Sequence, residues 1–189
     1  MKYTPKIEKA LKVAAVCHRD QLRKSDVAIP YIIHPFAVAI ILSNYTDDEN
    51  TIVAGLLHDT IEDSEYTPEE LTRDFGPDVC EIVMGVTEKK SDGKEKLPWK
   101  VRKDAYIENL ENDRVESLMV CAADKIHNMR NLLDDKKLVG EEAGKNFNST
   151  PEERLWYHEE ILRVLKTKLD SNIIDEYERL LTETRKSKM

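Results

Sequence analysis

The apolar residues of this chain recur at intervals of three or four positions, and no convincing segment alternates between apolar and polar residues. Ile7, Leu11 and Ala14 follow this spacing near the start, and Val79 and Ile82 repeat it farther on. Residues three or four apart share one face of a helix, whereas a half-buried strand needs a period of two. The 35% of charged and 6% of aromatic residues also favour helices. We therefore expect an all-α bundle, and 189 residues suit a single domain.

Short motifs mark where several of these helices begin and end. The sequences TDDE at 46–49 and TPEE at 67–70 and 150–153 have the form of a capping box, in which a Thr side chain and a Glu side chain satisfy backbone N–H groups at the helix start. Pro35 and Pro77 suit a first helical turn, and Gly76 suits a helix end. The predicted helices cover about 5–22, 35–44, 46–63, 67–76, 99–110, 114–133, 150–169 and 172–184. One more helix is predicted to begin at 77 and to end before a polar loop at 88–98.

The charge and composition exclude several classes of function. The net charge is −8, which disfavours binding to nucleic acid polymers, because such binding relies on Lys and Arg to neutralise phosphates. No run approaches the ~18 apolar residues of a membrane span, and the N-terminal MKYTPKIEKA lacks the apolar stretch of a signal peptide. The three cysteines form no CxxC pair and are typical of a reducing compartment. We expect a cytoplasmic protein that acts on a small molecule.

The stretch GLLHDTIEDSE at 55–65 combines a buried helical face with four ionisable groups, His58, Asp59, Glu62 and Asp63. On a helix these groups spread over neighbouring faces, because adjacent residues differ by about 100° around the axis. An isolated buried carboxylate is costly and needs a cation, hydrogen bonds or water. A divalent ion would satisfy several of these groups at once. The alternative is a solvated acidic helix end, although acids are poorly placed at the negative end of a helix dipole.

Two residues elsewhere in the chain complete a candidate metal site. His34 precedes Pro35, which opens a helix and fixes the backbone, and Asp124 lies among small and apolar residues. The alternatives are a surface or core histidine and an ion pair between helices. Two imidazoles and two carboxylates make a mixed nitrogen and oxygen set that suits Mn²⁺, Fe²⁺ or Zn²⁺ better than Ca²⁺.

These residues stand in motifs that resemble a known family. HP at 34–35, LLHDTIED at 56–63 and ADKIHNMR at 123–130 are similar, in this order, to the HD-superfamily metal-dependent phosphohydrolases. More narrowly, they resemble the hydrolase domain of RelA/SpoT proteins and the stand-alone small alarmone hydrolases. RK at 23–24, PY at 30–31, FG at 75–76 and GVT at 85–87 extend the resemblance over about residues 5–133. It implies a single HD-type domain over 1–189, with that core and a helical extension at about 150–184.

The resemblance implies a role for each matching residue. The metal ligands would be His34, His58, Asp59 and Asp124. The family usually binds Mn²⁺, with Fe²⁺, Zn²⁺ and Mg²⁺ as alternatives. The groups that act on the attacking water would be Glu62 and Asp63. The substrate contacts would be Arg23, Lys24, Tyr31 and Asn128. His18 and His127 fit a supporting structural role better than a catalytic one, and His158 fits a helix surface.

The implied activity is hydrolysis of a (p)ppGpp-like nucleotide, which loses its 3′-diphosphate as pyrophosphate, as in the stringent response. The segment between Lys24 and Pro30 lacks the glycine common in the family, and Asn131 replaces a usual Thr, so the exact nucleotide stays open. Three other hypotheses remain: a nucleotidase for deoxynucleoside monophosphates, a non-catalytic nucleotide sensor with a structural metal, and a helical protein-interaction module in which these residues lie apart. The oligomeric state is also open.

Overall fold

The structure, a computed structural model, describes residues 2–23, 29–91, 93, 95–140 and 148–187. Its helices are α1 (Pro5–Cys17), α2 (Ile33–Leu42), α3 (Glu49–Leu57), α4 (Thr60–Asp63), α5 (Pro68–Phe75), α6 (Pro77–Val86), α7 (Trp99–Asn112), α8 (Val115–Val139), α9 (Pro151–Lys168) and α10 (Ile173–Lys186). Over these residues the only β pairing is two isolated bridges, Leu22 with Pro30 and Ser91 with Lys96. The predicted all-α class is confirmed. Within the same described residues, no helix is both long and apolar enough for a membrane crossing.

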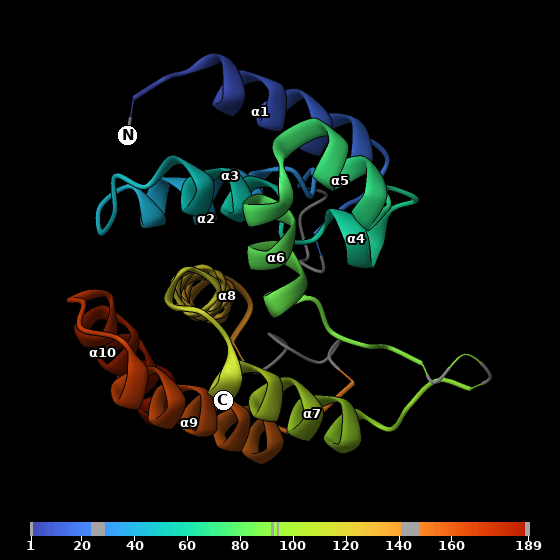
Figure 1. Cartoon of the computed structure of the whole chain (residues 1–189). Helices are drawn as coiled ribbons and strands as arrows, with labels where there is room; N and C mark the ends of the chain where they lie inside the picture. The colour runs from blue at the N-terminus through green and yellow to red at the C-terminus, as the bar shows by residue number, and fades with distance from the viewer. Residues whose placement is uncertain (1, 24–28, 92, 94, 141–147, 188–189) are drawn as a thin grey trace.

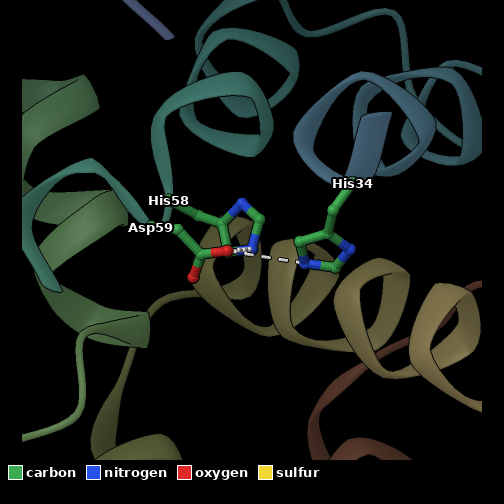
Figure 2. A group of neighbouring side chains, drawn as sticks. All are labelled: His34, His58 and Asp59. Carbon is green, nitrogen blue, oxygen red and sulfur yellow. Dashed lines mark ion pairs between the residues drawn. The ribbon is translucent and has the colours of Figure 1, made fainter. Parts of the chain in front are cut away.

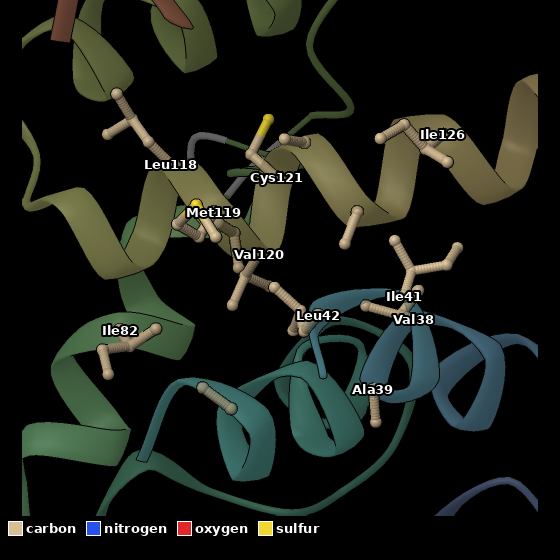
Figure 3. Close-up of a cluster of buried hydrophobic side chains, with 14 of the residues drawn as sticks. Val38, Ala39, Ile41, Leu42, Ile82, Leu118, Met119, Val120, Cys121 and Ile126 are labelled. Atoms are coloured by element: carbon tan, nitrogen blue, oxygen red, sulfur yellow. The ribbon is translucent and has the colours of Figure 1, made fainter. Parts of the chain in front are cut away.

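Helix α8 is the central element of the bundle (Figure 1). Helices α2, α3 and α6 contact it on one side, and α9 and α10 contact it as well. Buried apolar residues of every helix except the short α4 form one continuous cluster, and Ile61 of α4 packs against it. Figure 3 shows part of it, where Val120 of α8 points toward Leu42 of α2. Since α8 also carries Asp124, this packing fixes the position of one candidate ligand relative to α2 and α3.

Capping follows the sequence signals at two helix starts and departs from them at a third. Thr67 and Thr150 each form a full capping box with the glutamate three positions later, as predicted. At the start of α3 the cap is Asp48 rather than Thr46, because the Asp48 carboxylate accepts a hydrogen bond from the Thr51 backbone N–H at 2.7 Å.

The predicted helix over 46–63 is wrong in one respect that matters for the site, because it divides into α3 and α4. His58 and Asp59 occupy the turn between the two helices. The hydroxyl of Thr60 donates to the Leu57 carbonyl at 2.6 Å, so a side chain satisfies a carbonyl at this break. The acids Glu62 and Asp63 then follow on the short α4.

The first predicted helix is also shorter than expected, ending at Cys17 rather than near residue 22. The residues after it pair with the segment before α2 instead. The Tyr31 N–H donates to the Gln21 carbonyl at 2.8 Å, and the Arg23 N–H donates to the Ile29 carbonyl at 2.9 Å. This pairing brings Arg23 and Tyr31 to the same place. Helix α8, in contrast, runs past the predicted end to Val139.

Candidate active site

Three of the predicted ligands converge at the start of α2 and the α3–α4 turn (Figure 2). One ligand atom from each of His34, His58 and Asp59 lies within 4.8 Å of the others. Asp59 Oδ2 is 3.1 Å from His58 Nε2 and 3.5 Å from His34 Nε2. Both imidazoles are buried, with His34 1% and His58 3% exposed. Residues 24 positions apart in sequence thus form one compact group.

Asp124 reaches the same group from α8. Its Oδ1 lies 3.2 Å from His34 Nε2, so His34 links Asp124 to the other three. The second oxygen of Asp124 accepts from Lys125 Nζ at 2.6 Å, and Oδ1 also accepts from the Asn128 amide at 2.5 Å. The ion pair of Asp124 with Lys125 lies within α8, whereas the alternative interpretation required an ion pair between helices.

The donor set fits a divalent cation. The neutral form of His58 that donates from Nδ1 to the Gly55 carbonyl at 2.9 Å leaves a lone pair on Nε2. That Nε2 is buried and makes no hydrogen bond of acceptable geometry, although Asp59 is close. Burial opposes protonation of His58, but Asp59 and Asp124 outweigh it and raise the pKa to about 9. The cluster therefore has a buried orphan nitrogen and a demand for positive charge, which a metal ion would satisfy.

His127 supports His34 from the side away from the carboxylates. The two Nδ1 atoms are 2.7 Å apart, so one of them must donate to the other. Burial lowers the pKa of His34, and burial followed by the neighbouring His34 lowers the pKa of His127 to about 3, so both rings are neutral. If His34 donates from Nδ1, its Nε2 keeps the lone pair that a metal needs. His127 is thus placed to accept from His34 in the tautomer that metal binding requires.

The two acids Glu62 and Asp63 lie one turn beyond the cluster and are held by the segment after α6. Glu62 Oε1 accepts from the Glu88 backbone N–H at 2.5 Å. Lys90 Nζ lies 3.3 Å from Glu62 Oε2 and 2.5 Å from Asp63 Oδ1. Burial raises the pKa of Glu62 above its ordinary value. A carboxylate with a raised pKa beside a candidate metal site is suited to accepting a proton from water.

Sequence reasoning missed Lys90, because the polar 88–98 loop reads as a solvated connector. Several lysines stand in that loop, and nothing in the pattern distinguishes the one at position 90. Only the folding of the loop back onto α4 identifies it.

The predicted substrate contacts also lie together where the structure describes them. Arg23 Nη2 donates to Asn128 Oδ1 at 3.0 Å, and the Arg23 guanidinium lies 5.5 Å from the centre of the Tyr31 ring. Tyr31 Oη donates to Asp59 Oδ2 at 2.6 Å, which connects this group to the candidate ligands. The predicted contact Lys24 lies outside the described residues.

A cavity of about 750 Å³ opens beside the cluster. Its lining includes Arg23, Tyr31 and Asn128 together with Tyr157 and His158 of α9. The C-terminal extension is therefore part of the cavity wall, which the sequence did not reveal. His158 contacts Tyr177 of α10. It is half-buried, and its Nδ1 lies 3.0 Å from Tyr177 Oη.

Comparison with known families and proteins gives a consistent result. A family model described as "HD domain" matches residues 10–147. The chain is 38% identical over 129 residues to the guanosine-3′,5′-bis(diphosphate) 3′-pyrophosphohydrolase MESH1 of Drosophila melanogaster, covering 67% of this chain and 69% of that one. It is 45% identical over 128 residues to a GTP pyrophosphokinase of Streptomyces coelicolor, which covers 67% of this chain. The chain spans only 14% of that larger protein.

The fold comparison agrees with the sequence comparison. The solved structure of a metazoan ortholog of SpoT, described as hydrolysing ppGpp, superposes with a TM-score of 0.80 at 28% identity. The match covers 97% of both chains. It therefore includes α9 and α10, which lie beyond the reach of the family model.

Proposed function

The chain belongs to the HD domain family, and from this premise we propose that it hydrolyses a (p)ppGpp-like nucleotide and removes the 3′-diphosphate as pyrophosphate. One observation carries the proposal: two imidazoles and two carboxylates meet beside a cavity, with Glu62 and Asp63 one turn farther on. The names of two relatives that span much of this fold support the choice of substrate.

The proposed metal ligands are His34, His58, Asp59 and Asp124. A bound divalent cation would supply Lewis acidity, which polarises a phosphoryl oxygen and lowers the pKa of water. Mn²⁺ suits this mixed set of nitrogen and oxygen donors, with Fe²⁺, Zn²⁺ and Mg²⁺ as the alternatives. Tyr31 and Lys125 hold the two carboxylates by hydrogen bonds, so that the acidic oxygens stay in place without substrate.

The acids, Lys90 and the nucleotide contacts each have a separate role in the proposed hydrolysis. Glu62 accepts the proton of the water that attacks the phosphorus next to O3′, and the bond from phosphorus to O3′ breaks. The O3′ atom takes up that proton, which gives the nucleoside 5′-diphosphate (or 5′-triphosphate) and pyrophosphate. Asp63 and Lys90 hold Glu62 in place, because Lys90 pairs with both carboxylates. Arg23, Lys24, Tyr31 and Asn128 contact the nucleotide, and Arg23 can bind phosphate through two N–H groups.

We also propose a domain organisation, a cellular location and a class of substrate for the protein. We treat residues 1–189 as one HD-type domain, because the buried cluster is continuous from α1 to α10. A cytoplasmic location agrees with the three free cysteines, Cys17, Cys80 and Cys121. A small nucleotide, rather than a nucleic acid polymer, agrees with the net charge of −8.

The test is a panel of nucleotides incubated with the purified protein and each divalent metal, followed by identification of the products. We expect guanosine 3′,5′-bis(diphosphate) to give pyrophosphate. Turnover of deoxynucleoside monophosphates alone would establish the nucleotidase instead, and tight binding without product would establish the sensor.

Two substitutions separate metal binding from chemistry. Asp59→Asn should abolish both metal binding and turnover, because Asp59 Oδ2 lies within 3.5 Å of both imidazole Nε2 atoms. Glu62→Gln should keep the metal and lower kcat by about 10²–10⁴-fold, the range for loss of a general base. Hydrolysis at the parent rate by the Glu62→Gln protein would show that Glu62 has another role.

A further inference from the structure

Helix α4 carries both proposed acids, yet it is too short to hold its own position. It spans only four residues, Thr60–Asp63, of which Thr60 alone is buried. An isolated helix shorter than about 12 residues is marginal in water, so a short helix in a protein is held by contacts with other elements. The distance between Glu62 and the candidate metal ligands therefore depends on the residues that anchor α4.

Side chains from two distant segments bind the last two carbonyl groups of α4. Lys90 Nζ donates to the Glu62 carbonyl at 3.3 Å, and Gln21 Nε2 donates to the Asp63 carbonyl at 2.5 Å. The last carbonyls of a helix have no partner within the helix, and side chains from elsewhere can satisfy them. Gln21 thus caps α4 from the segment after α1, and Lys90 does so from the segment after α6.

The backbone of Gln21 connects the same residue to the proposed substrate contact Tyr31. The Gln21 carbonyl accepts from the Tyr31 N–H at 2.8 Å. Tyr31 Oη in turn donates to Asp59 Oδ2 at 2.6 Å. One residue therefore ties the helix of the acids to the tyrosine that holds a candidate metal ligand.

His18 is placed to set the direction of the Gln21 amide. A backbone carbonyl only accepts hydrogen bonds, so the amide nitrogen of Gln21 faces Asp63 and the amide oxygen faces away. That oxygen lies 2.8 Å from His18 Nδ1, which donates to it because an amide oxygen only accepts. His18 is buried, and its Nε2 has no hydrogen-bond partner among the described residues. The bond to Gln21 is thus the one side-chain hydrogen bond that the described residues give this imidazole.

We propose that Gln21 is a positioning residue of the candidate active site, which His18 orients from the core and which holds α4 at a fixed distance from the metal ligands. This inference rests on the proposed function and adds to it, because it explains how Glu62 is kept in place. A shift of about 1 Å in a reacting group can cost about 10²-fold in rate. Gln21 also lines the cavity, so the experiment must separate positioning from direct contact with the substrate.

The first experiment measures hydrogen–deuterium exchange over the peptide that contains α4, in the presence of Mn²⁺ and without substrate. The amides of Asp63 and Ser64 report on this turn, because they donate to the carbonyls of Asp59 and Thr60. In Gln21→Met they should exchange about 3- to 10-fold faster than in the parent, as for loss of a neutral hydrogen bond. Exchange at the parent rate would refute the anchoring of α4.

Two variants of His18 test the orientation of the amide. His18→Phe keeps a ring beside Tyr31, whose ring centre is 5.0 Å away in the parent, and removes the donor. It should speed exchange as Gln21→Met does, whereas His18→Asn retains a donor near the place of Nδ1 and should behave nearly as the parent. Because His18 acts through Gln21, the protein with both His18→Phe and Gln21→Met should match Gln21→Met alone. Additive effects would show that His18 does not act by orienting Gln21.

The matched control is Asn109→Leu. Asn109 Nδ2 donates to the Gly85 carbonyl at 3.0 Å, so it makes the same kind of bond between an amide side chain and a distant backbone carbonyl. Asn109 does not line the cavity. This variant should leave the exchange of the α4 amides unchanged. Equally fast exchange in Asn109→Leu and Gln21→Met would indicate a general loss of stability and would contradict a local anchor.

Steady-state kinetics with the nucleotide that the panel identifies give the functional test. Gln21→Met should lower kcat by about 10-fold and keep KM and the dissociation constant for Mn²⁺ within about twofold of the parent. A raised KM at unchanged kcat would mean that Gln21 contacts the substrate directly, against the positioning role. A different substrate, or none, would refute the proposed function, while the exchange result would still decide whether Gln21 anchors α4.

Discussion

Replacing His127 with phenylalanine should weaken metal binding without touching any proposed ligand. In the parent protein the Nδ1 atoms of His127 and His34 are 2.7 Å apart, and His34 is 1% exposed. A metal on His34 Nε2 requires the proton on Nδ1, which must then donate to His127. Phenylalanine accepts no such bond, so the metal-binding tautomer would carry a buried N–H without a partner.

The size of the effect follows from that orphan donor. A buried unsatisfied donor costs about 1–3 kcal/mol, which corresponds to about 5- to 150-fold in an equilibrium constant. Loss of a residue that supports a metal-binding histidine typically costs about 10- to 100-fold in affinity. We therefore expect His127→Phe to raise the dissociation constant for Mn²⁺ by about 10- to 100-fold.

The assay is a calorimetric titration of the metal-free protein with Mn²⁺, together with thermal unfolding of the metal-free form to confirm that the variant folds. The matched control is His158→Phe, because His158 lines the same cavity but contacts Tyr177 rather than the cluster. The control should bind Mn²⁺ within about twofold of the parent. If His127→Phe is folded and binds Mn²⁺ as tightly as the parent, the tautomer argument is refuted.

Two further predictions concern the acids and the core. Lys90→Met should move the acid limb of the pH–rate profile to higher pH, because the Lys90 charge favours ionised Glu62 and its removal raises the pKa of that carboxyl further. The neighbouring Lys89 provides the control variant, Lys89→Met. If the acid limb of the pH–rate profile were the same in Lys90→Met and Lys89→Met, the coupling between Lys90 and Glu62 would be disproved. Gly85→Ala should destabilise the fold by about 1–3 kcal/mol, because a Cβ there would lie 2.2 Å from Asp113 Oδ2 and 2.5 Å from Ser117 Oγ. Denaturant unfolding measures this effect, and an unchanged midpoint would mean that α6 and α8 can separate freely.

The sequence alone determined the fold class and the identity of the chemical groups. Helical spacing and capping motifs depend on neighbours within a few residues, so TPEE at 67–70 and 150–153 marked α5 and α9 correctly. The motifs around His34, His58, Asp59 and Asp124 likewise have recognisable local patterns.

Tertiary structure alone decided how those groups are held. The break between α3 and α4 places His58 and Asp59 in a turn, whereas local periodicity predicted an uninterrupted helix. The contact of Lys90 with Glu62 and Asp63 spans 27 or 28 residues, and that of His34 with His127 spans 93. Lys103 and Tyr157 meet only because α9 packs beside α7. No pattern within a short window encodes such pairs, since each depends on helices that pack around α8 through the shared apolar core.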